Sequence, residues 1–330
     1  MIKIKVIILT MLIISTIIFG EEIPVDKSFY LFRNNDVADA AMGNTGFIFT
    51  TKNSVDTNPA AMANLDKAYY YLGYNHSDYV DGINLTESKN YKSLNYFGVS
   101  SSTGGFYYRR LKKSGEVEGT IRKYEFISNE LGLATVKKIN STGLSFGGKL
   151  KIYVNELDDA KLEGTELKLN REIGYGYAID AGVLYKVGMF SFALNGDNIL
   201  GNIYWKNYEN VYINSSIKTG TGIEYGILKY GVSLERILKK GTDTRYGQGV
   251  ELKIFSIPKT SSSVFKGCSL RMRSGIVSTK FMKSENSQKS YGMELSRDNY
   301  YIDILTESAD IDIFSSNKNK IYKFAVGAAY

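Results

Sequence analysis

The chain from residue 67 onward alternates between apolar and polar positions with a period of two. In the segment 174–187 the odd-numbered positions are apolar, whereas the even-numbered positions are small or polar, with Leu184 as the one exception. Because successive side chains of a β-strand point to opposite faces of a sheet, this pattern predicts strands that have one apolar face. The alternation recurs in the segments 144–154, 228–235, 246–254 and 270–276.

These segments predict an antiparallel membrane barrel of about fourteen strands, an even number as in bacterial outer-membrane barrels. Connections after odd-numbered strands are expected to be long loops, among them 77–91, 155–172 and 307–319. Connections after even-numbered strands are expected to be tight turns, with 256–263 as the exception. Long outer loops and short inner turns are typical of membrane barrels, and a soluble β-sandwich is the alternative. The strands are predicted to begin near residues 67, 92, 103, 128, 141, 173, 189, 210, 227, 244, 264, 288, 299 and 320.

The last predicted strand, 321–330, ends the chain on an aromatic residue. Its apolar face carries Tyr322, Phe324, Val326 and Tyr330. The C-terminal strands of outer-membrane barrels resemble this one closely, because the barrel-assembly machinery reads such a strand. We therefore expect it to close the barrel, with the assembly machinery and outer-membrane lipid as partners.

The first 20 residues have the features of a secretory signal. Lys3 and Lys5 precede an apolar run at 6–19, which is shorter than the ~20 residues of a membrane-spanning helix. Gly20 supplies a small residue at the expected cleavage site. This pattern predicts a cleaved signal at 1–20 and export to the outer membrane of a Gram-negative-type bacterium, with an uncleaved N-terminal anchor as the alternative.

The composition agrees with a strand-rich barrel. The chain has 26 tyrosines, 32 glycines and 3 prolines, and proline interrupts the hydrogen-bonded ladder of a sheet. The net charge of +7 is spread along the sequence without a basic stripe, so we expect no nucleic-acid partner. Cys268 is the only cysteine, which excludes an intrachain disulfide. Tyrosines near the predicted strand ends are expected in interfacial girdles: Tyr69, Tyr71, Tyr74, Tyr185, Tyr225, Tyr300 and Tyr322.

Residues 21–66 lack the alternation and predict a small plug ahead of the barrel at 67–330. Small residues dominate the second half of this stretch. Pro59 follows Asp56, Thr57 and Asn58, each of which can cap a short helix that has proline in its first turn. Two short helical turns are expected at about 36–42 and 58–64, around a small β-like piece.

Two groups of small residues in this stretch carry a family resemblance. A run that contains Gly43 and Gly46 is followed by Asn58-Pro59-Ala60. The pattern resembles the N-terminal region of FadL-type outer-membrane transporters, and it is more similar still to the PorV/PorQ group of that superfamily. The resemblance implies a barrel partly closed by its N-terminal segment. It implies hatch roles for Asn58, Pro59 and Ala60, and packing roles for Gly43 and Gly46.

The resemblance leaves the function open. FadL-type members take up hydrophobic small molecules, which makes such a molecule the expected ligand. PorV-type members act beside a protein-secretion machine, which makes secretion-complex proteins the alternative partners. A structural surface barrel without transport is a third hypothesis. We carry over no ligand-binding residue, because no barrel strand matches a pocket motif.

No motif for catalysis or for a cofactor is evident in the sequence. A serine or acid hydrolase needs a histidine beside its nucleophile or acid. The only histidine, His76, falls at the top of the first strand or in the first outer loop. Asp158 and Asp159 are expected at the solvated edge of a charged loop. We therefore expect no enzymatic activity, no cofactor and no metal.

Charges on the polar faces of the strands are expected to point into the barrel lumen. Inward charges of opposite sign on adjacent strands can pair and fix the shape of the lumen. We favour this bracing of barrel and plug, with a polar permeation path or an anion site as the alternative. The residues concerned are Lys149, Lys151, Asp180, Glu251, Lys253, Arg271, Arg273 and Glu294.

Overall fold

A single antiparallel sheet makes up most of the computed structural model, which describes residues 36–77, 91–116, 123–139, 142–163, 166–238, 244–281, 284–309 and 319–330. The strands are β1 (Tyr69–Ser77), β2 (Tyr91–Ser100), β3 (Gly104–Glu116), β4 (Lys123–Ile139), β5 (Leu144–Glu163), β6 (Glu166–Val187), β7 (Phe190–Tyr204), β8 (Val211–Tyr212), β9 (Ser215–Tyr225), β10 (Leu228–Leu238), β11 (Thr244–Ser256), β12 (Cys268–Phe281), β13 (Ser284–Arg297), β14 (Tyr300–Ala309) and β15 (Asn319–Ala329). Residues 1–35, which include the predicted signal, lie outside the described residues.

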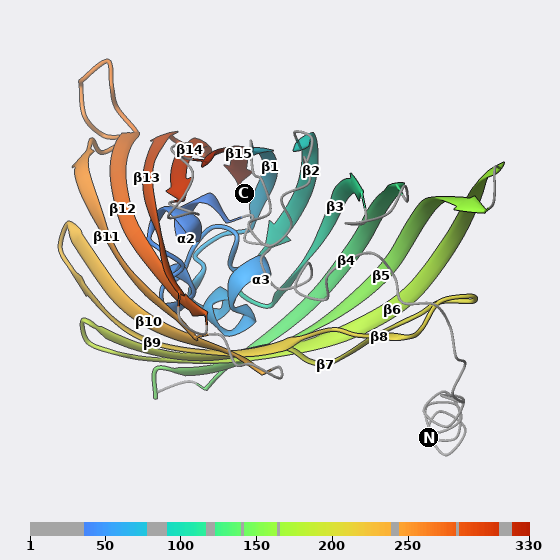
Figure 1. Ribbon diagram of the computed structural model, residues 1–330. Coiled ribbons are helices and arrows are strands. Elements are labelled where there is room, and N and C mark those ends of the chain that lie inside the picture. Colours follow the sequence, from blue (N-terminus) through green and yellow to red (C-terminus); the bar gives the residue numbers. More distant parts are fainter. Residues whose placement is uncertain are drawn as a thin grey trace.

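The sheet closes on itself as a barrel (Figure 1). Pairing of β1 with β15 completes the ring, and β6 pairs with β7 on its other side. Among the described residues β8 pairs only with β7, so fourteen of the fifteen strands form the closed wall. The predicted antiparallel barrel of about fourteen strands is confirmed. The last strand, β15, lies between β1 and β14, with Tyr322, Phe324 and Tyr330 exposed on the outside and Val326 half-buried.

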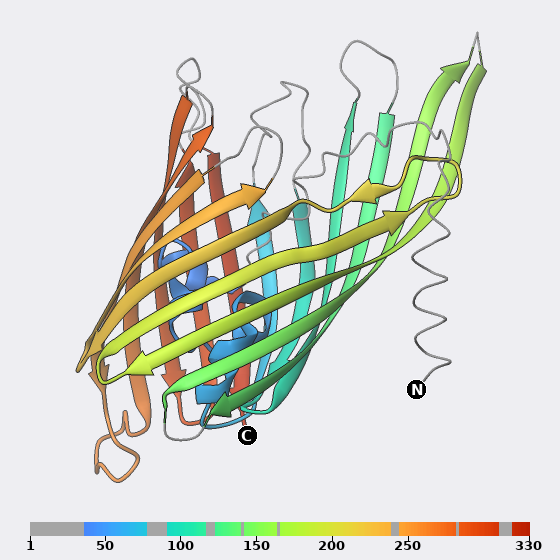
Figure 2. The same ribbon diagram turned by 90° about the horizontal axis from the view of Figure 1, so that it is seen from below.

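Several strands extend further at the outer end than the alternation predicted. The predicted loop 155–172 is wrong, because β5 and β6 remain paired up to Glu163 and Glu166. Charged side chains pair across this hairpin, with Arg171 Nη2 at 3.4 Å from Glu156 Oε2. Cross-strand pairs of opposite charge stabilise a ladder in water, so a charge-rich stretch can form strand. Figure 2 shows the hairpin projecting past the neighbouring strands.

The predicted solvated edge at Asp158 and Asp159 is wrong for Asp159. The chain after β7 folds inward and packs Trp205 and Tyr208 against the inner face of β5. Asp159 is buried there and accepts a hydrogen bond of 2.8 Å from the Tyr208 hydroxyl. Asp158 is half-buried and pairs with Arg171 at 3.2 Å.

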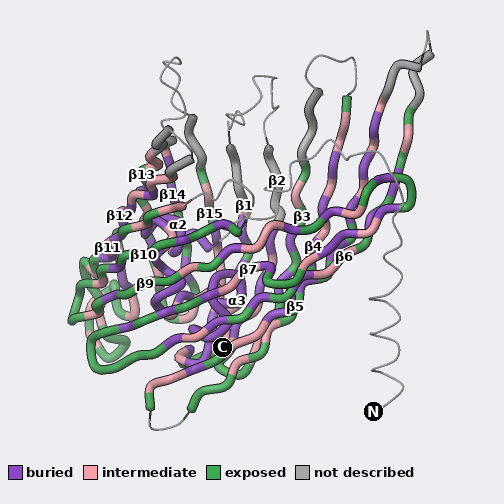
Figure 3. Tube along the Cα trace, turned by 60° about the horizontal axis from the view of Figure 1, so that its bottom comes forward, coloured by how far each residue is buried: buried purple, intermediate pink, exposed green. Residues whose placement is uncertain are grey.

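The two faces of the wall separate as the alternation predicts. On β10 the apolar positions from Leu228 to Leu234 are exposed on the outer surface, where they suit lipid. Leu184, the exception on β6, is buried because it packs inward against the plug residues Ala60 and Ala61. Figure 3 shows the plug mostly buried and the strands of the wall alternating between buried and more exposed residues.

The plug fills the lumen as an irregular chain of short helices (Figure 2). It consists of α2 (Val37–Ala41), η2 (Gly46–Ile48), α3 (Ser54–Thr57) and η3 (Pro59–Asn64). α2 and η3 lie where the two helical turns were expected. The β-like piece expected between them is wrong, because that stretch forms the helical turns η2 and α3. No helix in the described part of the chain is long and apolar enough to cross a membrane.

Glycines of the inner wall let the plug main chain approach closely. A Cβ atom on Gly249 would lie 2.0 Å from the carbonyl oxygen of Met42, and one on Gly275 would lie 2.0 Å from the amide nitrogen of Gly43. No side chain fits at these two contacts. The glycines on the polar face of β11 and β12 thus form the seat of the plug.

We predict that Gly249→Val displaces the plug while the barrel stays closed. Overpacking costs about 1–3 kcal/mol, which corresponds to roughly tenfold faster proteolysis of the plug in detergent. The mobility shift of the barrel on boiling in a denaturing gel should persist. Gly148→Val is the matched control, because a Cβ atom at Gly148 meets nothing within 4 Å. Equal protease resistance in the two variants would contradict the proposed seat.

Candidate functional site: the plugged lumen and a gap in its wall

The Asn58-Pro59-Ala60 segment is fixed by its own cap and by the wall. The Asn58 side chain accepts a hydrogen bond of 3.0 Å from the amide of Ala60 and donates one of 3.0 Å to the carbonyl of Phe47. Pro59 occupies the first turn of η3, where its missing N–H costs nothing. On the wall, Ser145 donates a hydrogen bond of 2.9 Å to the carbonyl of Ala60. The buried amide of Asn58 therefore joins the two halves of the plug.

The two plug glycines hold turns that a side chain would disturb. Gly43 has φ +62°, and a Cβ atom there would lie 2.5 Å from the carbonyl oxygen of Gln248 on β11. A Cβ atom on Gly46 would lie 2.6 Å from the Cα atom of Asp39. That close approach lets the Asp39 carboxylate accept a hydrogen bond of 3.0 Å from the amide of Phe47. Gly43 thus contacts the wall, and Gly46 packs inside the plug.

One ion cluster ties the plug to β11–β14. Arg273 is buried at its centre and lies 2.6 Å from Glu251, 2.6 Å from Glu294 and 2.8 Å from Asp303. From the plug, Lys52 reaches Glu294 at 2.6 Å. Because a buried charge is costly unless it is paired, each ion in this cluster depends on the others.

The other predicted charges of β11 and β12 lie at the margin of this cluster. Arg271 is partly exposed and pairs with Glu294. Lys253 stands opposite Arg271 in the strand register, but no ion pair of Lys253 occurs among the described residues. Asp303 of β14 and Lys52 of the plug are the two members that were not predicted from the sequence. The neighbours of Asp303 on the same face of β14 are Tyr301 and Leu305, so the sequence marks that face as polar only weakly.

A second ion cluster lies on β5 and β6. Lys149 and Lys151 approach Asp180 at 2.9 Å and 2.7 Å, and all three side chains are buried. Lys149 also donates a hydrogen bond of 2.7 Å to the carbonyl of Asp56 in the plug. The cluster therefore holds main-chain atoms of the plug as well as the wall.

Arg109 forms a third contact between plug and wall, and the sequence analysis did not single it out. It is buried on β3, where it lies 2.7 Å from Glu130 of β4 and 3.3 Å from Asp56 of the plug. Tyr107, two residues earlier on the same face, also donates a hydrogen bond to Glu130. This contact joins the plug to β3 and β4 of the wall.

A row of inward tyrosines lines the plug on β14, β1, β2 and β3. Neighbouring rings are in contact, with centroids 6.4 Å apart for Tyr301 and Tyr71, 5.7 Å for Tyr71 and Tyr96, and 5.5 Å for Tyr96 and Tyr107. The Tyr71 hydroxyl accepts a hydrogen bond of 3.0 Å from the amide of Val37. The girdle position predicted for Tyr71 is therefore wrong, because its ring faces the plug and not the membrane interface.

The ladder between β2 and β3 ends partway along the wall, and the stretch without pairing beyond this end is here called the gap. These strands pair from Ser100↔Gly105 up to Tyr96↔Arg109, and no further pairing between them is present in the described part of the chain. Both strands nevertheless continue, because β2 stays paired with β1 up to Tyr91 and β3 stays paired with β4 up to Glu116. The five residues 91–95 leave an unpaired edge of about 16 Å along β2.

A β-bulge explains where the gap begins. On the β1 side, Gly73 pairs with Tyr96 and Tyr74 pairs with Leu94, which leaves Asn95 without a partner in the ladder. An extra residue bends a strand and increases its twist. The bend directly follows the last β2–β3 pair, and Figure 2 shows the two strands diverging toward the outer end.

A closed wall with an apolar outside and a charged inside defines the class of the protein as an outer-membrane β-barrel. Neither a protein-family description nor a curated protein matches the sequence. Among solved structures, the chain is similar to the CymD monoaromatic hydrocarbon channel, with a TM-score of 0.67 and 9% identity over 90% of this chain and 98% of that chain. It is also similar to the toluene transporter TodX of Pseudomonas putida, with a TM-score of 0.58 and 12% identity over the same shares of the two chains. At these identities the likeness shows a common fold, that of the FadL-like outer-membrane barrels.

We predict that Arg273→Met destabilises the barrel far more than Arg271→Met. The first change leaves three buried carboxylates without their central cation, which costs about 3–5 kcal/mol. The second removes a partly exposed partner and costs about 1 kcal/mol. Urea unfolding in lipid vesicles measures both free energies of unfolding. Equal losses would contradict the central role of Arg273.

Docking of the plug should weaken as the pH rises. Burial, and then the charge of Asp39, raise the pKa of Asp36 to about 7. The docked plug therefore favours the protonated carboxyl of Asp36. The stability that this gives to the docked plug is complete below about pH 4 and is lost as the pH rises through about 7. The Asp36 side chain accepts hydrogen bonds from the amides of Ala38 and Asp39, and asparagine can accept both.

The measurement is proteolysis of the plug between pH 5 and pH 8. Proteolysis should become faster as the pH rises in the native protein. The slope against pH should correspond to the release of about one proton per molecule. Asp36→Asn should remove most of this dependence, whereas Asp66→Asn, at an exposed position outside the plug core, should keep it. The same pH profile in all three proteins would rule out titration of Asp36 as the cause.

Proposed function

We propose that the protein carries small hydrophobic molecules across the outer membrane, with the plug at 36–64 as a hatch. In this proposal the molecules leave the lumen through the wall, between β2 and β3. The observation that carries the proposal is the end of the β2–β3 ladder at the Tyr96↔Arg109 pair, beside the plug that lies in the lumen.

Physical chemistry favours a route through the wall for an apolar solute. The path along the lumen passes the two ion clusters and the plug, where an apolar molecule gains nothing from burial. The path between β2 and β3 leads past Tyr96 and Tyr107 directly into hydrocarbon. Aromatic rings offer such a solute contact area without a charge.

The comparisons suggest the first substrates to test. CymD is described as a monoaromatic hydrocarbon channel and TodX as a toluene transporter. We therefore propose small aromatic hydrocarbons as the substrate class, and we assign the protein no catalytic role. The alternative of an accessory in a secretion complex rests on the Asn58-Pro59-Ala60 motif and stays a prediction.

Arg109 places the lower end of the gap in contact with the hatch. Its guanidinium bridges Glu130 on the wall and Asp56 on the plug. A shift of the plug at Asp56 would therefore change the charge balance on β3 at the last residue pair below the gap. In this proposal, hatch movement and the opening of the wall are linked through this bridge.

We predict that deletion of Asn95 closes the gap and lowers uptake. Without the bulge, β2 can continue straight and pair with β3, because unpaired main-chain groups in lipid are costly. Uptake of radiolabelled toluene by cells that carry the protein in their outer membrane should fall by about tenfold or more, which corresponds to roughly 1.4 kcal/mol in the barrier. Asn95→Ala keeps the extra residue and should keep uptake.

Two further measurements make the result interpretable. The mobility shift on boiling and the protease resistance of the plug should be unchanged in both variants, because neither touches the plug seat. Undiminished uptake by the deletion variant, with both of these measurements normal, would rule out the route between β2 and β3.

A further inference from the structure

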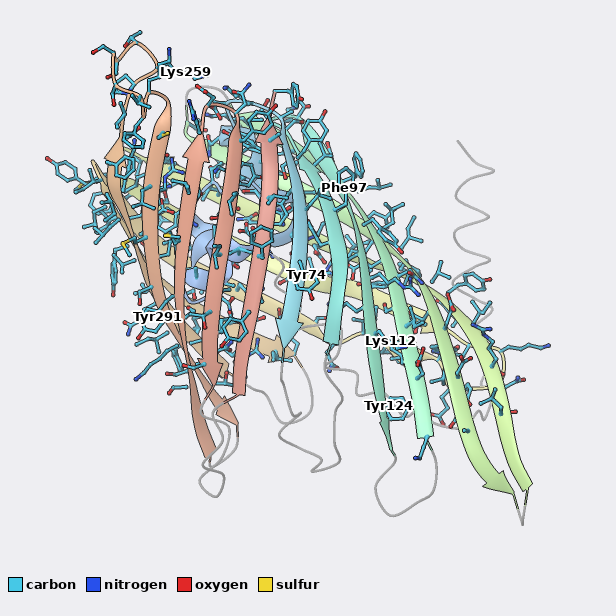
Figure 4. All side chains as sticks on the ribbon, turned by 90° about the horizontal axis from the view of Figure 1, so that it is seen from above. Tyr74, Phe97, Lys112, Tyr124, Lys259 and Tyr291 are labelled. Carbon is cyan, nitrogen blue, oxygen red and sulfur yellow. The ribbon has the colours of Figure 1, made fainter. Side chains whose placement is uncertain are left out.

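The connection between β11 and β12 differs from the other turns at the same end of the barrel. It spans residues 257–267, whereas β9 and β10 are joined by Gly226 and Ile227, and β13 and β14 by Asp298 and Asn299. The short turns and the C-terminal residue mark this end as the periplasmic one. Figures 2 and 4 show the loop projecting beyond the other turns, with Lys259 on it.

The 257–267 loop is held in shape by its own main chain. The amide of Ile257 donates a hydrogen bond of 2.9 Å to the carbonyl of Cys268, and the amide of Gly267 donates one of 2.9 Å to the carbonyl of Ile257. The amide of Lys266 also donates a hydrogen bond of 3.1 Å to the carbonyl of Ser263, and the amide of Cys268 donates one of 3.1 Å to the carbonyl of Phe265. The side chains of this loop are therefore presented in a defined arrangement.

Two apolar side chains of this loop face outward without cover. Val264 is 84% exposed and Phe265 is 65% exposed, and the value for Val264 is the highest among the large apolar residues of the described chain. Adjacent exposed apolar residues on an ordered loop favour contact with a membrane or with another protein.

The surroundings of Val264 and Phe265 favour a lipid surface. Lys259, Lys266 and Arg297 are exposed at this rim, and the acid beside them, Asp298, already pairs with Lys259 at 3.3 Å. Three cations against one acid attract anionic phosphate groups. Long lysine side chains can also reach phosphates while their stems lie along apolar surface.

The apolar surface of the loop is also continuous with the lipid-facing wall. Ile254 and Phe255 are exposed on the last residues of β11, just before the loop begins. A bulge between Lys253 and Phe255 turns the strand at this point. On the neighbouring turn, Ile227 is 64% exposed. Lipid that covers the wall can therefore reach the loop along these apolar side chains.

We propose that the 257–267 loop is a membrane anchor that inserts Val264 and Phe265 into the phospholipid of the periplasmic leaflet. Lys259 and Lys266 bind the phosphate groups of that leaflet. The loop fixes the depth of the barrel on the β11–β12 side, away from the gap between β2 and β3. This inference does not depend on the proposed transport.

Spin labelling of the reconstituted protein tests the anchor. A nitroxide is placed on Phe265→Cys in a Cys268→Ser background, in vesicles of phosphatidylethanolamine and phosphatidylglycerol. Collision with oxygen, which concentrates in lipid, is compared with collision with a water-soluble nickel complex. Ser262→Cys, on an exposed position of the same loop, is the matched control. We expect the ratio of oxygen to nickel collisions to be several-fold higher at position 265 than at position 262.

A second set of variants tests the lysines. Lys259→Glu combined with Lys266→Glu should lower the ratio at position 265 in these vesicles and change it less in phosphatidylcholine alone. The mobility shift on boiling confirms that each variant is folded. Equal nickel collisions at positions 262 and 265 would overturn the anchor. Immobilisation of the label at 265 by periplasmic extract, without a lipid effect, would overturn it in favour of a protein partner.

Discussion

Hydrocarbon offers no hydrogen-bonding partner to the main chain, and the rest of this structure depends on that constraint. A sheet can lie in a bilayer only if its edges are paired, which the β1–β15 and β6–β7 pairings accomplish. The upper part of the β2–β3 boundary is the exception, because the ladder there stops at Tyr96↔Arg109. A break in the ladder of a membrane barrel is costly, and the bulge at Asn95 lies directly beyond this one.

A closed sheet also places the polar faces of its strands in the lumen, where the plug supplies partners for them. The polar faces of the strands point inward, and their charges would be expensive to bury alone. Lys52 and the carbonyl of Asp56 enter the two ion clusters from the plug, so plug and wall satisfy each other's polar groups. Wall glycines permit this approach, and the inward tyrosines fill the space on the side of the gap. The plug is thus part of the folded barrel core and at the same time the element that obstructs the lumen.

The contacts between plug and wall are unevenly distributed around the barrel. On β11–β13 Lys52 reaches Glu294 at 2.6 Å and the plug main chain packs against Gly249 and Gly275, whereas at the gap Arg109 lies 3.3 Å from Asp56. A plug held more firmly on one side can move on the other without losing its seat. The longer of these two ion pairs lies beside the end of the β2–β3 ladder.

The period-two pattern by itself determined the strands, their approximate number and the face on which each side chain lies. It did so because that period is a local property of the extended chain. The plug was visible as a stretch without the pattern, and the caps at Asn58 and Pro59 follow from short-range rules. The charges at Lys149, Asp180 and Arg273 were also assignable to the polar face.

Only the tertiary structure decided which partner each inward side chain contacts. Tyr71 obeys the alternation of β1, yet only the position of the plug decides that its hydroxyl binds Val37 and not the membrane interface. The charged stretch that pairs Arg171 with Glu156 resembles a loop until its partner strand is present. The gap depends on the registers of β1, β2 and β3 together, and such a register is set by long-range pairing that no single segment encodes.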